Sequence, residues 1–364
     1  MPGEAWRWSV ERTGDAAAGK TPRVNASPDL SPLGIAVGHA TDDAGATGLT
    51  VVRGIDRPLR ASSAIFGRAT GSRELHAASA EHSVDGRVDA VVLTGGSAYG
   101  LDAVGGVMRW MEERGRGYSV GGGVVPIVPA AVVFDLAPLG RFDARPTPQM
   151  AYDATQNATS TSIAEGSVGG GTGTTVGKVL GPGLAMKGGF GCATEQSHDG
   201  ALTVAAMAVV NAFGDVRDAS GKIIAGARGR DGGFVDTMSV LRRGDVTAPV
   251  KLEDLAFRNT TIALVATSAP LSALELNQLA RAAGAALFRR ITPAGSLVDG
   301  DIVFAVSPEE GARWSMEIPG RRGRFDSMIV EALAVSALER AIERAVRLAR
   351  GRDGVPGLAD DHGH

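Results

Sequence analysis

The sequence predicts a layered α/β fold, and three observations support that prediction. Apolar segments of strand length recur along the chain, and turns rich in glycine separate them, with 51 glycines among 364 residues. Amphipathic helical patterns at 272–290 and 325–351 lie among these segments. Because an amphipathic helix must bury its apolar face, such helices among apolar strands favour stacked layers of both. No repeat or linker divides residues 31–350, so we expect one domain there, with a flexible arm at 1–30 and a flexible tail at 351–364.

The first part of the chain reads as strands with one helix among them. Residues 34–42 and 46–54 predict two strands joined by a polar turn. Residues 88–115 predict a buried strand, a glycine turn and a helix, for which Ser97 is the expected N-cap. The apolar positions of that helix recur at helical spacing, at Leu101, Val104, Val107, Met108 and Met111. Residues 201–216 predict a strand whose end includes Asn211.

The C-terminal part of the chain carries the clearest signals for individual elements. Residues 260–267, TTIALVAT, are apolar on both faces, which is typical of a strand buried on both sides. The serine and glutamate of 272–275 have the spacing of a capping box, which marks the start of a helix. Residues 299–306 predict another strand, and a long helix from residue 325 is expected to be closed by Gly351.

Composition and charge exclude several classes of protein. The formal net charge is −3, so bulk charge predicts affinity neither for nucleic acid nor for a membrane surface. No run approaches the ~20 apolar residues of a membrane helix, and the first residues lack the apolar core of a secretory signal. Cys192 is the one cysteine, which argues for a reducing compartment, and its neighbours carry no charge to activate the thiol. We therefore expect a cytoplasmic protein without nucleic-acid or membrane partners.

Familiar binding and catalytic motifs fail at specific positions. The glycine-rich run at 169–181 looks like a phosphate-binding loop, yet the first required glycine is Thr172 and no hydroxyl residue follows Lys178. Ser97 does not lie in a Gly-x-Ser-x-Gly turn, because the residue two positions later is Tyr99. The six histidines lack the spacing of metal ligands. We therefore expect no nucleotide, no metal and no other cofactor.

The segment Asn259-Thr260-Thr261 opens a buried strand with three polar residues that the core does not need. A threonine hydroxyl can attack the carbonyl just before it and move the acyl group from nitrogen to oxygen. Hydrolysis of that ester would leave Thr260 with a free α-amine, whose unperturbed pKa of about 7.7–8.0 suits a general base. A buried strand would hold the new terminus rigidly. Taken alone, the tripeptide is better explained as a turn residue followed by β-branched strand formers.

A resemblance over roughly residues 33–310 adds weight to the catalytic interpretation. RNTTIALVATSAPLSALELNQLARAAGAALFRR, with GIAVGHATD, LTGGSAYGLDAVGGV, VPIVPAAVVFDL, GTGTTVGKV and VVNAFGDV upstream, resembles the self-cleaving L-aminopeptidase/D-esterase family of N-terminal-nucleophile hydrolases. That family includes nylon-oligomer hydrolases and a pantetheine hydrolase. The Asn-Thr junction and a two-aspartate motif look more like the nylon-oligomer branch than the Gly-Ser aminopeptidase branch. The resemblance implies a four-layer α/β/β/α sandwich that cuts itself into a large subunit, 31–259, and a small subunit, 260–350.

The resemblance also implies roles for individual residues. The bond between Asn259 and Thr260 would be cut, and Thr260 would then be the nucleophile toward amide substrates. Asn211, at the end of its predicted strand, would donate its amide N–H to the oxyanion. Phe134 departs from the pattern, because nylon-oligomer hydrolases carry a tyrosine there. If that hydroxyl helps to hold the oxyanion in relatives, Asn211 and backbone N–H groups must suffice here.

Three charged residues complete the implied site. Asp299 and Asp301 are two apart at a strand edge, so their side chains are expected on one face. Beside the nucleophile they would orient its amine and hydroxyl and share a proton. Lys178 resembles the family's active-site lysine, and in a buried loop its ammonium would need a carboxylate partner, Asp299 or Asp301. Without the resemblance, a polar turn before a strand is the favoured explanation for the two aspartates, and a surface lysine is the alternative for Lys178.

Two other functions stay open at this stage. The related ornithine acetyltransferase type has a similar fold and also cuts itself to a threonine, but its acyl group passes to an amine and not to water. A non-catalytic scaffold would remain one uncut chain. For the hydrolase, peptides, β-peptides, D-amino-acid amides and nylon oligomers all remain possible substrates. The resemblance implies a homo-oligomer, a tetramer, in which each cut chain keeps both subunits.

Overall fold

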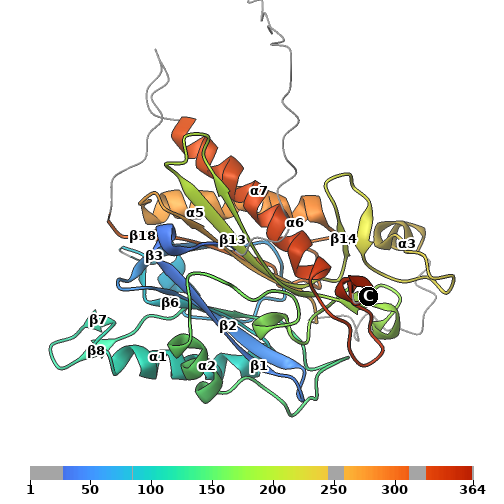
Figure 1. Ribbon diagram of the computed structural model, residues 1–364, viewed down its shortest axis with the longest axis horizontal. Helices are drawn as coiled ribbons and strands as arrows, with labels where there is room; N and C mark the ends of the chain where they lie inside the picture. Colours follow the sequence, from blue (N-terminus) through green and yellow to red (C-terminus); the bar gives the residue numbers. More distant parts are fainter. Residues whose placement is uncertain (1–27, 84, 245–257, 311–324, 363–364) are drawn as a thin grey trace, which may run out of the picture.

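Two β-sheets lie face to face, and helices cover the outer face of each sheet (Figure 1). The computed structural model describes residues 28–83, 85–244, 258–310 and 325–362, so most of the expected N-terminal arm lies outside the described residues. The order of the layers is helix, sheet, sheet, helix. This arrangement confirms the four-layer α/β/β/α sandwich.

The first sheet carries the N-terminal strands and has the order β1-β2-β6-β9-β4. Its strands are β1 Ile35–Asp42, β2 Thr47–Gly54, β6 Ala90–Thr94, β9 Ala130–Val132 and β4 Ser72–Arg73. Its outer face is covered by α1, Val104–Glu112, and α2, Pro148–Gln156, as the lower part of Figure 1 shows. The apolar stripe expected for the first helix packs there, with Val104, Val107 and Met111 fully buried.

The second sheet combines strands from both ends of the chain in the order β12-β13-β16-β18-β3-β5. These strands are β12 Gly189–Gln196, β13 Thr203–Asn211, β16 Thr260–Thr267, β18 Ile302–Pro308, β3 Leu59–Ile65 and β5 Arg87–Val88. Its outer face is covered by α5 Ala273–Ala283, α6 Ala285–Arg290 and α7 Phe325–Arg347. The predicted capping box at the start of α5 is present, because Ser272 and Glu275 exchange side-chain and backbone hydrogen bonds.

The central strands contribute side chains to two apolar layers, which explains why they are apolar on both faces. In β13, Ala206 and Val210 pack under the helices, whereas Met207 and Val209 pack between the two sheets. Every residue of β16 is buried, as its sequence predicts. Cys192 also lies buried between the sheets, and burial raises the pKa of its thiol.

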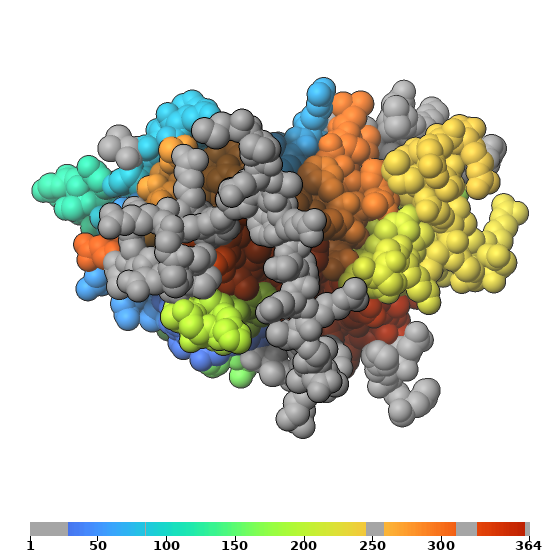
Figure 2. All heavy atoms as spheres, turned by 90° about the horizontal axis from the view of Figure 1, so that it is seen from above, coloured from blue at the N-terminus to red at the C-terminus, as the bar shows by residue number. Residues whose placement is uncertain are grey.

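Smaller elements flank the sandwich. A short sheet of β15 Ile223–Ala225, β14 Asp215–Arg217 and β17 Ile291–Thr292 lies beside α3, Thr237–Arg243. Figure 2 shows these residues of α3 (yellow) at one end of the molecule, next to the helices over the second sheet. The remaining short strands form two pairs, β10 Thr175–Val176 with β11 Met186–Lys187, and β7 Tyr118–Ser119 with β8 Val124–Val125.

Two predicted helix ends are wrong. Ser97 does not cap its helix: it begins the 3-10 turn Ser97–Ala103 with a positive φ of 51°, and no side-chain cap hydrogen bond forms. Gly351 does not close α7, which already ends at Arg347. Gly351 is instead required by packing, because a Cβ there would lie 2.8 Å from the backbone nitrogen of Gly357.

After α7 the chain returns to the body of the molecule. The N–H of Lys187 donates to the carbonyl of Pro356 at 2.9 Å, and the N–H of Ala359 donates to the carbonyl of Ala349 at 3.0 Å. The described residues 351–362 are therefore hydrogen-bonded to the sandwich and end in the 3-10 turn Leu358–His362.

Candidate active site

Thr260 begins β16 in the middle of the second sheet. In the antiparallel register with β13 it lies directly opposite Asn211. On its other side, Asn259 forms a parallel bridge with Asp299, just before β18 begins. Thr260 is only 4% exposed. The sheet therefore places one hydroxyl, one amide side chain and the Asp299–Asp301 turn around a single strand end.

The peptide carbonyl before Thr260 is held by two donors. The Thr260 hydroxyl donates to the carbonyl oxygen of Asn259 at 2.5 Å. The backbone N–H of Gly300 donates to the same oxygen at 2.9 Å. The hydroxyl thus lies against the peptide group that it would attack, and a backbone donor already points at the oxygen on which negative charge would develop.

Asn211 and Lys178 form a second cluster of hydrogen bonds, one residue further upstream. The Nδ2 of Asn211 donates to the carbonyls of Phe134 and Arg258, both at 3.0 Å. Its Oδ1 accepts from the backbone N–H of Thr175 at 3.0 Å and from Lys178 at 2.9 Å. Asn211 is therefore rigidly oriented beside the start of β16, and both of its amide hydrogens are used in the uncut chain.

Among the described residues, no carboxylate makes the direct contact with Lys178 that the sequence led us to expect. Its buried ammonium donates to Oδ1 and the carbonyl of Asn211 and, at 3.2 Å, to the carbonyl of Arg258. Burial lowers the pKa of Lys178 to about 7, although the charge of Asp299 opposes that shift. Charge-assisted hydrogen bonds are worth about 1.5–3 kcal/mol each, so three of them offset part of the cost of burying this charge. Neutral oxygens thus replace the expected ion pair.

Asp299 and Asp301 flank Gly300, and both are buried. Asp301 accepts from the backbone N–H of Thr261 at 2.6 Å and from that of Gly295 at 2.8 Å. Burial and the neighbouring charge of Asp299 raise the pKa of Asp301. These contacts fix the register between β16 and the residues before β18.

The side chain of Asp299 faces its own loop. It accepts from the backbone N–H of Ser296 at 3.1 Å and from the Ser296 hydroxyl at 2.5 Å. All five candidate residues therefore gather around the start of β16, namely Lys178, Asn211, Thr260, Asp299 and Asp301.

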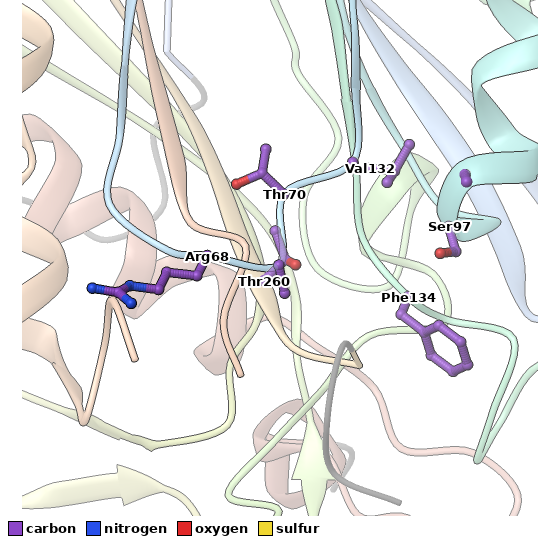
Figure 3. A pocket seen from close by; sticks show the side chains of 9 residues that line it. Arg68, Thr70, Ser97, Val132, Phe134 and Thr260 are labelled. Atoms are coloured by element: carbon purple, nitrogen blue, oxygen red, sulfur yellow. The ribbon is translucent and has the colours of Figure 1, made fainter. Parts of the chain in front are cut away.

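A small pocket opens beside the hydroxyl of Thr260, with a volume of about 250 Å³. Figure 3 shows Thr260 between Arg68 and Thr70 on one side and Val132, Ser97 and Phe134 on the other. The full lining consists of Arg68, Ala69, Thr70, Gly71, Ser97, Ala98, Val132, Phe134 and Thr260. Sequence reasoning missed residues 68–71, because no motif marks them.

The wall that contains Ser97 is a strained turn held by a buried acid. Gly96 and Ser97 both have positive φ, at 80° and 51°. The carboxylate of Asp135 accepts from the N–H of Gly96 at 2.6 Å and from the hydroxyl of Thr47 at 2.7 Å. Burial raises the pKa of Asp135 to about 6. A non-glycine residue with positive φ often marks a functional turn, and here it lines the pocket.

Phe134 lines the same wall of the pocket as Ser97, and its ring offers no hydroxyl there. Its carbonyl, rather than its ring, contacts Asn211.

Within the described ranges, no group of three or more His, Cys, Asp or Glu side chains is arranged to hold a metal ion. Likewise, no helix in the described part of the chain is long and apolar enough to cross a membrane.

Comparisons with known proteins agree on one family. The profile of peptidase family S58 matches residues 30–359. An uncharacterized aminopeptidase of Mycobacterium leprae is 37% identical over 362 residues, covering 92% of this chain and 93% of that protein. A 6-aminohexanoate-oligomer endohydrolase of a Kocuria species is 29% identical over 317 residues, covering 84% of this chain and 80% of that enzyme.

The fold has solved counterparts as well. The L-aminopeptidase D-Ala-esterase/amidase of Ochrobactrum anthropi superposes with a TM-score of 0.64 at 20% identity, covering 91% of this chain and 92% of that chain. That structure is described as a variant of the Ntn-hydrolase fold. At this level of identity the likeness shows the fold alone.

Proposed function

This chain belongs to peptidase family S58 and is a hydrolase of peptide or amide bonds, and we propose that it first cuts itself between Asn259 and Thr260. The cut would leave a large subunit ending at Asn259 and a small subunit beginning at Thr260. The new N-terminal threonine would then hydrolyse small peptides or amides. One observation carries this proposal: the Thr260 hydroxyl and the Gly300 N–H both lie on the carbonyl oxygen of Asn259.

Self-cleavage would proceed by acyl transfer and hydrolysis. The Thr260 oxygen attacks the carbonyl carbon of Asn259, and the developing oxyanion is held by the N–H of Gly300. The C–N bond breaks, and the proton of the hydroxyl ends on the nitrogen, which becomes the free α-amine of Thr260. Water then hydrolyses the ester, so that Asn259 gains a carboxylate and the hydroxyl is restored.

In the cut enzyme the α-amine of Thr260 would act as base for its own hydroxyl. Its unperturbed pKa of about 7.7–8.0 keeps a fraction of it neutral near neutral pH. The hydroxyl attacks a substrate amide, the amine passes the proton to the leaving nitrogen, and water releases the acyl group. Asn211 would stabilise the oxyanion once the carbonyl of Arg258 no longer occupies one of its hydrogens. Lys178 would orient Asn211, and Asp299 and Asp301 would hold Thr260 in register.

Intact mass spectrometry of three purified proteins tests the proposal. Wild type is expected as two fragments, 1–259 and 260–364, and Thr260→Ala as a single chain. Thr260→Ser retains a hydroxyl and is the matched control, so it should still be cut at the same bond. An uncut wild type, or cleavage of Thr260→Ala at this bond, would contradict the mechanism.

A further inference from the structure

The pocket beside Thr260 is lined by one cation and by no carboxylate, among the residues that the structure describes. We propose that it selects amide substrates that carry a carboxylate, with Arg68 as the group that binds it, over substrates that present a free ammonium. This inference rests on the proposed role of Thr260 and adds the substrate class.

The two carboxylates beside the start of β16 are already occupied. Asp301 is 2% exposed and accepts two backbone N–H groups, from Thr261 and Gly295. Asp299 is 1% exposed and accepts both donors of Ser296. A substrate ammonium entering the pocket would lose its water shell without meeting a carboxylate there, which is unfavourable.

Arg68 differs from these aspartates because it is exposed, and no hydrogen bond or ion pair joins its side chain to any described residue. Its backbone is nevertheless fixed relative to the nucleophile. The N–H groups of Arg68 and Ala69 donate to the carbonyl of Asp299 at 2.7 and 2.9 Å. Gly67 allows this close approach, since a Cβ there would lie 2.2 Å from the same carbonyl oxygen.

The two ends of the pocket differ in chemistry. Figure 3 shows the side chain of Arg68 extending away from Thr260, on the side opposite the ring of Phe134. An amide whose carbonyl lies on Thr260 would therefore place one half against Val132 and Phe134 and extend the other toward Arg68. A guanidinium binds a carboxylate through two parallel hydrogen bonds. A substrate that ends in a neutral or cationic group cannot form this pair of hydrogen bonds.

Two matched substrate series test this subsite in the complete, purified enzyme. In the first, p-nitroanilides carry a succinyl, butyryl or β-alanyl group, which end in a carboxylate, a methyl or an ammonium. In the second, benzamides of β-alanine, propylamine and ethylenediamine carry the same three ends on the amine side. The carboxylate is expected to give the highest kcat/KM in at least one series. Preference for the ammonium in both would overturn the proposal.

Variants of Arg68 assign the preference to this residue. Arg68→Gln should lower the ratio of kcat/KM for carboxylate over neutral substrate by about ten- to a hundred-fold, mainly through KM. Arg68→Lys should recover part of that ratio. Arg243→Gln removes an exposed arginine of α3 that does not line the pocket, and should leave the ratio unchanged. A ratio that Arg68→Gln does not alter would refute the assignment.

A binding measurement separates this proposal from the proposed reaction. Calorimetry of the same amides with Thr260→Ala needs no turnover. The carboxylate amides should bind more tightly than the neutral amides, and this difference should be lost when Arg68→Gln is added to Thr260→Ala. If no substrate is turned over but this difference is present, the nucleophile assignment fails and the subsite stands. Equal binding of carboxylate and neutral amides would sink the subsite, whatever the activity.

Discussion

At the scale of single residues, the geometry around Thr260 depends as much on backbone atoms as on side chains. The carbonyl of Asn259 is polarised by the N–H of Gly300, a residue between the two predicted aspartates. The absence of a side chain at Gly300 matters too. A Cβ there would lie 2.6 Å from the carbonyl oxygen of Ala69 and 2.8 Å from the Thr260 hydroxyl oxygen.

Gly300→Ala should therefore slow self-cleavage at least ten-fold, because the added methyl displaces either the hydroxyl or the backbone donor. The rate at which the 260–364 fragment appears on a denaturing gel measures this effect. Gly105→Ala is the matched control, since a Cβ there meets nothing within 4 Å. It should leave cleavage unchanged and stabilise α1 by up to about 1 kcal/mol. Wild-type cleavage in Gly300→Ala would argue against the role of its N–H.

The family resemblance predicted the candidate side chains of this site but not their contacts. Hydroxyl, amide, lysine and carboxylate groups can be read from motifs, and the structure brings all of them to one strand end. The partner of Lys178 was expected to be a carboxylate and is a set of neutral oxygens. Spacing along the chain does not say which oxygen an ammonium will reach, because that depends on how separate segments pack.

At the scale of elements, the glycine-rich segment 169–176 orients Asn211 and is itself held by a buried lysine. Lys187 in β11 donates to the carbonyls of Gly171, Thr174 and Gly188 at 2.8, 3.0 and 3.1 Å. Burial lowers the pKa of Lys187 to about 7, with Arg352 adding to the shift and Asp135 opposing it. The segment that looks like a phosphate loop thus serves to position a side chain.

This burial predicts a pH dependence of stability. From pH 7 to about 10 the unfolded chain keeps the Lys187 proton while the folded chain releases it, so the free energy of unfolding rises by at most about 1.4 kcal/mol per pH unit. Below pH 7 both states hold the proton and this contribution becomes constant. Urea unfolding of Thr260→Ala near pH 7.5 and 9.5 measures this rise in the free energy of unfolding. Adding Lys187→Met to Thr260→Ala should make the rise smaller. Lys222→Met, at an exposed site, should keep the full rise, and equal rises in all three proteins would refute the shift.

At the scale of the whole molecule, the cut would leave two subunits that both contribute strands to the second sheet. From β13 to β3 the second sheet alternates between them: β13 belongs to the large subunit, β16 and β18 to the small, and β3 to the large again. The small subunit also supplies α7, which packs on β12 and β13, and α5, which packs on β18 and β3. Separating the subunits would expose both apolar layers at once.

The subunits should therefore stay together after cleavage. Under native conditions size-exclusion chromatography should elute 1–259 and 260–364 in one peak, with both masses present in it. In concentrated guanidinium chloride they should separate. Two native peaks of different mass would contradict the shared sheet, and an uncut Thr260→Ala chain eluting with the native wild type is the control.

The sequence by itself determined the class of fold, the buried strands, the start of α5 and, through the family resemblance, the candidate residues of the site. These features depend on hydrophobic periodicity, capping chemistry and motifs, which are local properties of the chain. Only the tertiary structure decided that the Gly300 N–H lies on the Asn259 carbonyl, and that Arg68 and Ser97 line the pocket. Backbone donors leave no signature in a sequence. Arg68 and Ser97 are far from Thr260 along the chain, and only the folded structure brings them close to it in space.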